Sequence, residues 1–310
     1  MSKSKFGVIY SRLHPVIEPG EFGRRAEVAG FDSIWVTEGL ANQRAALDPV
    51  VTMMAIAERT HQIMVGSCVI LLPLRTPAVF AKEIASLDIL SGGRIILGVG
   101  VGASTLSNPA DFRAGGIDPK HRGALCDEIL DCLVAFWRGK STTYHGRFFD
   151  FDDIVLKPVP WQSPYPALWM GGQADGVLKR TARIGDGFVP IGTGPEHYFA
   201  LWSKVANLAH ASGRDPETIT RAVHLYCCLD NNGEKALETV ERTLTERYGF
   251  EVRLSDRSAS LIGTLDECTR VIESYRRAGV EHFVINIARP LQEVPEAMLQ
   301  LAEELLPRFR

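Results

Sequence analysis

Apolar residues along the chain alternate between short runs rich in β-branched side chains and longer stretches in which they recur every three or four positions. Short runs of this kind predict buried strands, and the longer stretches predict amphipathic helices. The strands are expected at residues 5–10, 31–37, 63–71, 94–100, 167–171, 187–191, 219–229 and 281–288.

Helical periodicity fills most of the chain between and after these runs. The helices are expected at residues 19–29, 49–60, 77–90, 121–137, 174–184, 195–211, 234–248, 265–278 and 294–306. Parallel strands need crossover connections, and eight strand–helix units can close without a free edge. The order therefore predicts an α/β fold, a (β/α)8 TIM barrel. An open doubly wound sheet is the alternative, because alternation does not reveal closure.

Three stretches interrupt this rhythm and are interpreted as loop insertions into the barrel. They lie at about 103–120, 140–160 and 250–262, and the second has the pattern of a hairpin. No Ser/Gly-rich linker divides the chain. We therefore expect one barrel domain over residues 1–310.

Composition excludes several classes of protein. The 34 basic and 37 acidic residues leave a net charge of −3, so a nucleic-acid partner is not expected. The most apolar stretch, 65–74, has about half the ~20 residues of a membrane-spanning helix, and the N-terminus lacks the apolar core of a signal peptide. These features predict a cytoplasmic protein without a membrane partner. The six cysteines show no C-x-x-C spacing and are expected to be reduced and buried.

Glycine-rich segments follow three of the strands, where a barrel places its chemistry. Residues 98–103 formally satisfy the dinucleotide fingerprint, but no helix follows at once, so close approach to a ligand or tight packing fits better. Segments 171–173 and 192–194 each lead into a helix. Free N–H groups at such a position suit a phosphate, although a plain strand–helix turn has the same composition.

Familiar catalytic clusters are absent from the sequence. The eight histidines show no metal-ligand spacing, so no metal site is expected. Neither G-x-S-x-G nor a phosphate-binding G-x-x-x-x-G-K-[ST] motif occurs. Two polar residues at strand ends, Glu38 and His14, are the candidate catalytic residues, and each is equally well an ordinary surface or structural residue.

Two long strings, AVFAKEIASLDILSGGRIILGVGVG and PYPALWMGGQADGVLKRTARIGDGFVP, resemble the bacterial luciferase-like family of flavin- and deazaflavin-dependent oxidoreductases. Supporting segments extend the resemblance over most of the chain. It implies a (β/α)8 barrel whose mouth binds FMN or the deazaflavin coenzyme F420, and commonly a homodimer. A separate flavin or F420 reductase is a further candidate partner.

The resemblance also implies roles for particular residues. Gly171 and Gly172 would hold the cofactor phosphate through backbone N–H groups, and a non-prolyl cis peptide would lie at the Cys68–Val69 bond. The cofactor-binding residues that it implies are Val69, Ile70, Gly100, Gly102, Gly171, Gly172, Gln173 and Thr193.

Two positions depart from the family pattern. Deazaflavin-using relatives often carry an acidic residue followed by His after the second strand, whereas this chain has Glu38 and Gly39. An acidic residue of the sugar-phosphate-oxidising relatives is replaced by Ala103, which weakens that assignment. Glu38 alone, or His14 from the neighbouring loop, would then move the proton, unless the reaction needs little acid–base help.

Three functional hypotheses follow. The leading one is hydride transfer between coenzyme F420 and a small organic substrate. The second is an FMN-dependent two-component monooxygenase supplied with reduced flavin by a separate reductase. The third is a barrel that binds a flavin or another ligand without turnover. Cofactor chemistry would carry either reaction, with the protein supplying position and exclusion of water.

Overall fold

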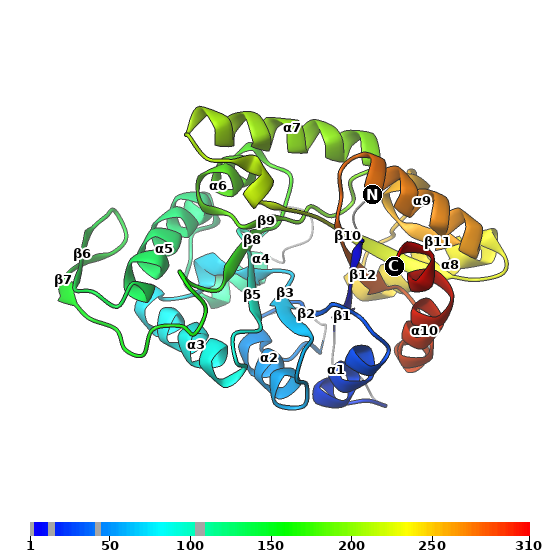
Figure 1. The fold of residues 1–310 in the computed structure, drawn as a ribbon, viewed down its shortest axis with the longest axis horizontal. Helices are drawn as coiled ribbons and strands as arrows, with labels where there is room; N and C mark the ends of the chain where they lie inside the picture. The colour runs from blue at the N-terminus through cyan, green and yellow to red at the C-terminus, as the bar shows by residue number, and fades with distance from the viewer. Residues whose placement is uncertain (1–2, 12–15, 41–44, 103–108) are drawn as a thin grey trace.

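The structure is a computed structural model that describes residues 3–11, 16–40, 45–102 and 109–310. Within these residues eight parallel strands form a closed ring, because β9 pairs with β10 and β12 pairs with β1 (Figure 1). Their order around the ring is β1 (Lys5–Tyr10), β2 (Ser33–Val36), β3 (Met64–Ser67), β5 (Ile95–Gly100), β8 (Ala167–Met170), β9 (Gly187–Phe188), β10 (Thr220–Leu229) and β12 (His282–Ile287). The predicted (β/α)8 barrel is confirmed, and the open sheet is not formed.

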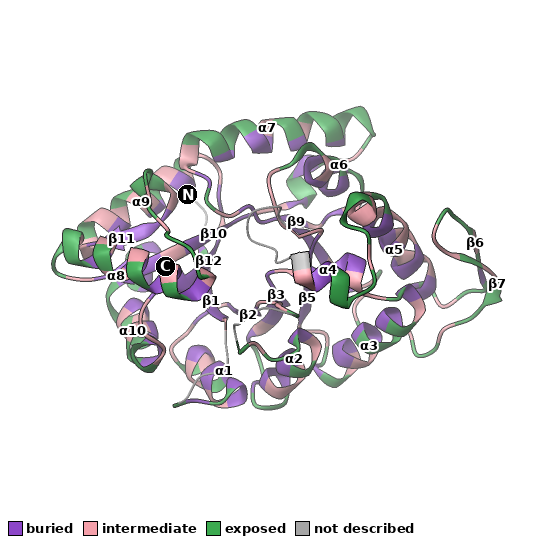
Figure 2. Cartoon of the chain, turned by 180° about the vertical axis from the view of Figure 1, so that it is seen from behind, coloured by how far each residue is buried: buried purple, intermediate pink, exposed green. Residues whose placement is uncertain are grey.

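Helices surround the ring, with buried residues on the faces turned to the strands and exposed residues outside (Figure 2). Their ends differ from the predicted ones by a few residues at most, except at the C-terminus. They are α1 (Pro19–Val28), α2 (Pro49–Glu58), α3 (Pro77–Leu90), α5 (Arg122–Trp137), α6 (Asp175–Ile184), α7 (Pro195–Ala211), α8 (Gly233–Tyr248), α9 (Leu265–Arg277) and α10 (Val294–Gln300).

Local chemistry accounts for where several helices begin. Proline occupies the first turn of α1, α2, α3 and α7, where its missing N–H would have no helical partner. At α9 the side chains of Thr264 and Glu267 form a reciprocal capping box. The predicted last helix is α10 followed by one π turn, Leu301–Leu305, and a 3-10 turn, Leu306–Phe309.

The third predicted strand is divided into two. β3 ends at Ser67, and β4 (Ile70–Leu71) pairs separately with the end of β5. Between them the Cys68–Val69 peptide bond is cis, as the resemblance implied.

The insertions have structure of their own. Strands β6 (Thr142–His145) and β7 (Asp150–Ile154) form an antiparallel hairpin that projects beyond α5 (Figure 1). The stretch near 250–262 contains β11 (Leu261–Gly263), which pairs in parallel with the end of β10. The first stretch is only partly described and contains α4 (Pro109–Ala114). No helix among the described residues is long and apolar enough to cross a membrane.

Three apolar clusters hold the barrel together. The largest lies between strands and helices, and a second fills the barrel interior around Trp35 and Trp169, whose ring centroids are 4.9 Å apart. A third packs α8 against the ends of β10 and β11. All six cysteines are buried and free, as expected. Farther along β10 and β12, beyond Ala222 and Val284, the next positions in the alternation are the polar residues His224 and Asn286. One polar part of the interior therefore lies toward the carboxyl ends of the strands, and Ser33 and His282 form another at the amino ends.

Candidate functional site

Three predicted residues meet at the carboxyl ends of β3, β5 and β8. Val69 packs between Gly100 and Gly171. A Cβ atom at Gly100 would lie 2.7 Å from Val69 Cγ2, and one at Gly171 would lie 2.5 Å from Val69 Cγ1. Only glycine leaves room for the valine at both positions. Val69 therefore fills the space over both glycines, Gly100 is buried, and Val69 and Gly171 stay partly exposed; we call these three residues the glycine floor (Val69, Gly100, Gly171).

One detail of the predicted phosphate site, the role of the Gly171 N–H, differs in the structure. The Gly171 N–H donates to the Val99 carbonyl at 3.0 Å, because the β5–β8 ladder extends one residue past β8. This N–H is therefore not a phosphate donor, and Gly171 contributes its missing side chain instead. Among the described residues no partner is found for the N–H groups of Gly172 and Gln173, the next two positions.

Gln173 and Thr193 come together although they follow different strands. The Gln173 side-chain amide and the Thr193 hydroxyl both donate to the Ile191 carbonyl, the latter at 3.3 Å. Thr193 is buried, and its own carbonyl accepts the hydroxyl of Tyr275 from α9. These bonds join the loops after β8 and β9 into one corner beside the glycine floor.

The remaining predicted residues have different positions. Ile70 is fully buried in the layer between strands and helices, so its side chain does not line the barrel mouth. Gly102, just past β5, has φ of +79°, a conformation that favours glycine. His14 and Ala103 lie outside the described residues.

Glu38 lies in a buried ion pair. One carboxylate oxygen accepts the Leu71 N–H, and the other accepts a hydrogen bond from the guanidinium of Arg75. Asp48 lies 3.5 Å from the same guanidinium. Burial raises the pKa of Glu38, while Arg75 and the Leu71 N–H oppose that rise. The carboxylate thus fixes β4, two residues beyond Val69.

A second polar group lies on β10 and β12 and was not predicted. Arg247 Nη1 donates to Asn286 Oδ1 at 3.0 Å, and the Asn286 amide nitrogen lies 3.2 Å from His224 Nε2. His224 Nδ1 in turn lies 3.7 Å from the sulfur of Cys68. We call these four residues the polar relay (Arg247, Asn286, His224, Cys68).

Hydrogen-bond chemistry fixes the direction of the polar relay. A guanidinium only donates, so Asn286 must present its oxygen to Arg247 and its NH2 group to His224. His224 Nε2 then accepts, which assigns the ring proton to Nδ1, facing Cys68. Burial lowers the pKa of His224 to about 3 and raises the pKa of Cys68 to about 12. Arg247 is therefore the one charged member of the polar relay at neutral pH.

The sequence does carry a signal for Arg247. The buried face of α8 consists of Ala236, Val240, Thr243, Leu244 and Arg247, at the three- and four-residue steps of a core-facing stripe. An arginine on such a stripe is unusual, because charged side chains are seldom buried without a partner. His224 likewise interrupts the apolar run of β10.

Comparison with known proteins identifies the family. The family model for luciferase-like monooxygenases matches residues 14–282. The chain belongs to the luciferase-like monooxygenase family. A curated relative, an F420-dependent glucose-6-phosphate dehydrogenase of Beutenbergia cavernae, is 31% identical over 314 residues that cover 92% of this chain and 91% of the relative. The protein is therefore an enzyme, and its class is oxidoreductase.

Solved structures share the fold at low identity. An F420-dependent secondary alcohol dehydrogenase in complex with an F420-acetone adduct has a TM-score of 0.83 at 21% identity, with both chains covered completely. The oxygenating constituent of 3,6-diketocamphane monooxygenase from the CAM plasmid of Pseudomonas putida, in complex with FMN, has a TM-score of 0.79 at 19% identity, covering 100% and 99%. At these identities the likeness shows the luciferase-like barrel.

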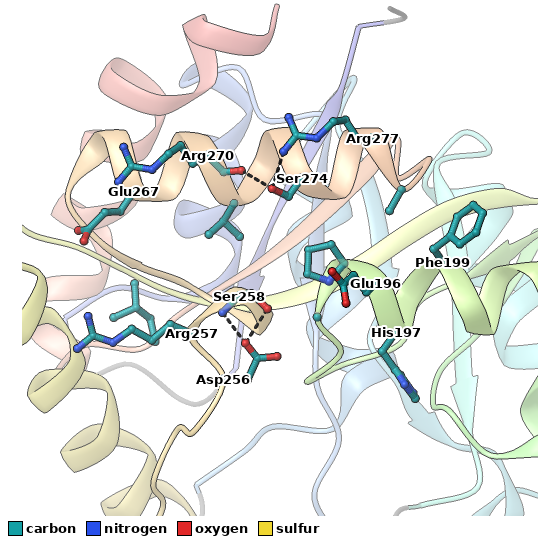
Figure 3. Close-up of a pocket in the computed structure, with 15 residues that line it drawn as sticks. Glu196, His197, Phe199, Asp256, Arg257, Ser258, Glu267, Arg270, Ser274 and Arg277 are labelled. Carbon is teal, nitrogen blue, oxygen red and sulfur yellow. Dashed lines mark hydrogen bonds between the residues drawn. The ribbon is translucent and has the colours of Figure 1, made fainter.

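A large cavity of this luciferase-like enzyme is separate from the glycine floor. It has a volume of about 1050 Å³ and lies between the start of α7, the outer face of α9 and the loop before β11 (Figure 3). Its lining begins at Gly194, next to Thr193. The charged residues in the lining balance one another: Arg257, Arg270, Arg277, Glu196, Asp256 and Glu267. The balance favours no ligand charge. Among the described residues, no group of three or more His, Cys, Asp or Glu side chains is arranged to hold a metal.

Proposed function

We propose that this enzyme transfers a hydride between coenzyme F420 and a small organic substrate at the barrel mouth. The glycine floor carries the proposal, because Val69 and Gly171 are its partly exposed members and neither has a long side chain, so a flat ring would lie against them. The F420-dependent relative, which is similar over nine tenths of both chains, supports the choice of cofactor.

The described residues fit such a cofactor. When bound, its deazaflavin ring would supply the hydride chemistry. The unpartnered N–H groups of Gly172 and Gln173 are suited to its phosphate, and Thr193 lies beside them through the Ile191 carbonyl. Gly102, at the open end of β5, would complete the surface under the ring.

In this proposal the acidic residue after β2 has a positioning role. Both Glu38 oxygens are engaged by β4 and Arg75, so the carboxylate fixes the segment that carries Val69. His14, which follows β1 in the sequence, is the proposed proton donor in place of the family histidine, since Gly39 has no side chain. His224 and Cys68 carry no charge, and their side chains would lie under the ring as an uncharged support.

A titration tests the proposal. Purified protein titrated with coenzyme F420 should quench the deazaflavin fluorescence and saturate at one equivalent per chain. FMN, titrated in parallel by its own fluorescence, should bind more weakly. Tight FMN binding together with absent F420 binding would overturn the hydride-transfer proposal.

The second candidate function is an FMN-dependent two-component monooxygenase. The observation that favours it is the shared barrel of the FMN-bound diketocamphane monooxygenase. Oxygen uptake with reduced FMN, accompanied by a hydroxylated product, would select this candidate, and it would then require a separate reductase as partner.

We also propose the organisation that the sequence predicted: a single barrel domain over 1–310, a homodimer and a cytoplasmic location. One cooperative unfolding transition is expected for a single domain. Sedimentation should give a mass near 68 kDa for the dimer, about twice the 34.2 kDa of the chain. Cell fractionation tests the location, and a monomeric mass would rule out the dimer.

A further inference from the structure

Arg247 is a buried arginine whose guanidinium has few hydrogen-bond partners within the described residues. Its side chain projects from α8 toward the ends of β10 and β12, and the residue is 5% exposed. Nη1 donates to Asn286, while Nη2 reaches the Ile287 carbonyl only at 3.5 Å. Nε is buried and has no hydrogen-bond partner. A guanidinium carries five N–H donors, so most of its capacity is unused.

No carboxylate of the described residues pairs with this guanidinium. Its neighbours are neutral: Asn286, the imidazole of His224 and the ring of Tyr226, whose centroid lies 6.0 Å away. Another buried arginine, Arg180, has Asp127 at 2.6 Å. Burying a charge without a partner is costly, and buried charges are normally paired. Arg247 therefore lacks the anion that its environment calls for.

The location of Arg247 identifies what would supply that anion. Its contact Asn286 occupies the inward-facing position next to His224, and His224 contacts Cys68 at the start of the cis bond below Val69. The guanidinium thus lies at the same end of the barrel as the glycine floor. It is held by β10 and β12, which face the glycine floor across the barrel. A planar guanidinium binds carboxylate or phosphate oxygens in pairs.

We propose that Arg247 anchors an anionic oxygen group of the substrate, either a carboxylate or a phosphate. This assignment rests on the proposed function, because it makes the substrate an anion held opposite the cofactor surface. Asn286 is then a positioning residue that holds the guanidinium in place.

Wild-type protein provides the first test. The F420-loaded enzyme is titrated with inorganic phosphate and, separately, with acetate, against chloride at equal ionic strength, and heat and Tm are recorded. Phosphate or acetate should bind saturably and raise Tm, because a ligand that binds only the folded state stabilises it. The anion that binds more tightly identifies the substrate group. If neither binds saturably, the proposal is wrong.

Three variants locate the anion. Arg247→Gln should weaken anion binding by at least about tenfold, since a charged hydrogen-bond pair is lost. Arg247→Lys keeps the charge and should retain part of the affinity, which guards against a folding defect in the glutamine variant. Arg183→Gln, which removes a half-exposed arginine of α6, is the matched control and should leave binding unchanged. Equal affinity in wild type and Arg247→Gln would overturn the assignment.

A parallel titration with F420 alone separates this proposal from the preceding one. If Arg247→Gln weakens F420 binding as much as anion binding, the guanidinium holds the cofactor phosphate and the substrate assignment is wrong. If wild-type protein does not bind F420, the proposed function fails. Anion binding to the cofactor-free protein then decides the Arg247 assignment independently, by the same comparison of wild type with Arg247→Gln.

Discussion

The two arginines that are buried within the described part of the chain, Arg180 and Arg247, differ in how their charge is balanced. Arg180 lies between α5 and α6, where Asp127 neutralises it at 2.6 Å and the Gly123 carbonyl accepts a further bond at 2.8 Å. Arg247 lies at the barrel mouth with an amide and a carbonyl as its partners. In the helix layer the charge is balanced within the protein, as structure requires. At the mouth it is unbalanced, which is typical of a site that takes its counter-charge from a ligand.

Replacing each arginine by methionine should separate these two roles most strongly. Arg180→Met removes the bonds of a buried guanidinium to Asp127, whose side chain is 44% exposed, and to a part-buried carbonyl, so it should lower the free energy of unfolding by roughly 2 kcal/mol. Arg247→Met removes an unpaired buried cation as well as its bond to Asn286. These effects oppose each other, so a change within about 1 kcal/mol is expected. Urea unfolding without added anions measures both.

The comparison fails if Arg247→Met is as destabilising as Arg180→Met. In that case the guanidinium of Arg247 is needed for folding, and its missing carboxylate has no functional meaning. Circular dichroism at the start of each unfolding curve controls for a changed native state.

The opposite wall of the mouth should respond to volume instead of charge. In Gly171→Ala the new methyl group would clash with Val69 Cγ1, 2.5 Å from the built Cβ. Overpacking of this kind lowers stability by about 1–3 kcal/mol. The methyl group would also push the Val69 side chain toward the space of the ring, so F420 should bind roughly 10- to 100-fold more weakly. Fluorescence quenching measures the affinity.

A double variant checks that crowding is the cause. Val69→Ala removes the methyl groups that clash, so Gly171→Ala/Val69→Ala should recover part of the lost affinity. The control is Gly123→Ala on α5, where the new Cβ lies 3.4 Å from Arg180 Nη2 and binding should not change. If the double variant binds as weakly as Gly171→Ala, the loss does not come from the contact with Val69.

The glycine floor and the polar relay differ in how far their residues could be predicted from the sequence. The alternation of apolar runs was enough for the ring of strands, because each parallel strand needs a crossover helix. The resemblance supplied Val69, Gly100 and Gly171. It could not show that the Gly171 N–H is used by Val99, since that depends on how far the β5–β8 ladder extends.

The missing counter-charge of Arg247 could not be predicted from the sequence, for another reason. Whether a buried charge is paired depends on contacts between distant segments, here 39 residues apart for Arg247 and Asn286. A helical stripe shows that the side chain faces inward, and only the fold shows that no carboxylate of the described residues meets it. The sequence shows only that His224 has no metal-ligand spacing to another histidine, whereas its role in the polar relay comes from the pairing of β10 with β12.

Protonation offers a smaller test that spans both ends of the barrel. Burial lowers the pKa of His224, at the mouth, and of His282, which bonds to Ser33 at 2.8 Å, to about 3. An unfolded histidine has a pKa of about 6.5, so between about pH 6.5 and 3 the unfolded chain binds more protons. Stability therefore falls as the pH falls through this window, by about 1.4 kcal/mol per pH unit for each histidine.

His282→Gln should remove one of these two contributions. Glutamine can still bond to Ser33 but does not titrate, so the slope of unfolding free energy against pH near pH 5 should fall by the share of one histidine. Urea unfolding at several pH values measures the slope. An unchanged slope would mean that His282 is protonated in the folded protein, contrary to its burial.

The smallest effect is expected where charge is balanced but exposed. Arg183 and Asp131 belong to the same helix pair as Arg180 and Asp127 and lie as close, at 2.5 Å, yet their side chains are 46% and 40% exposed. Water solvates both groups when the pair is broken, so Arg183→Gln should lower the free energy of unfolding by less than about 1 kcal/mol. A loss as large as that of Arg180→Met would show that burial does not set the value of these pairs. The contrast between Arg180 and Arg247 would then have to be sought in geometry instead of solvation.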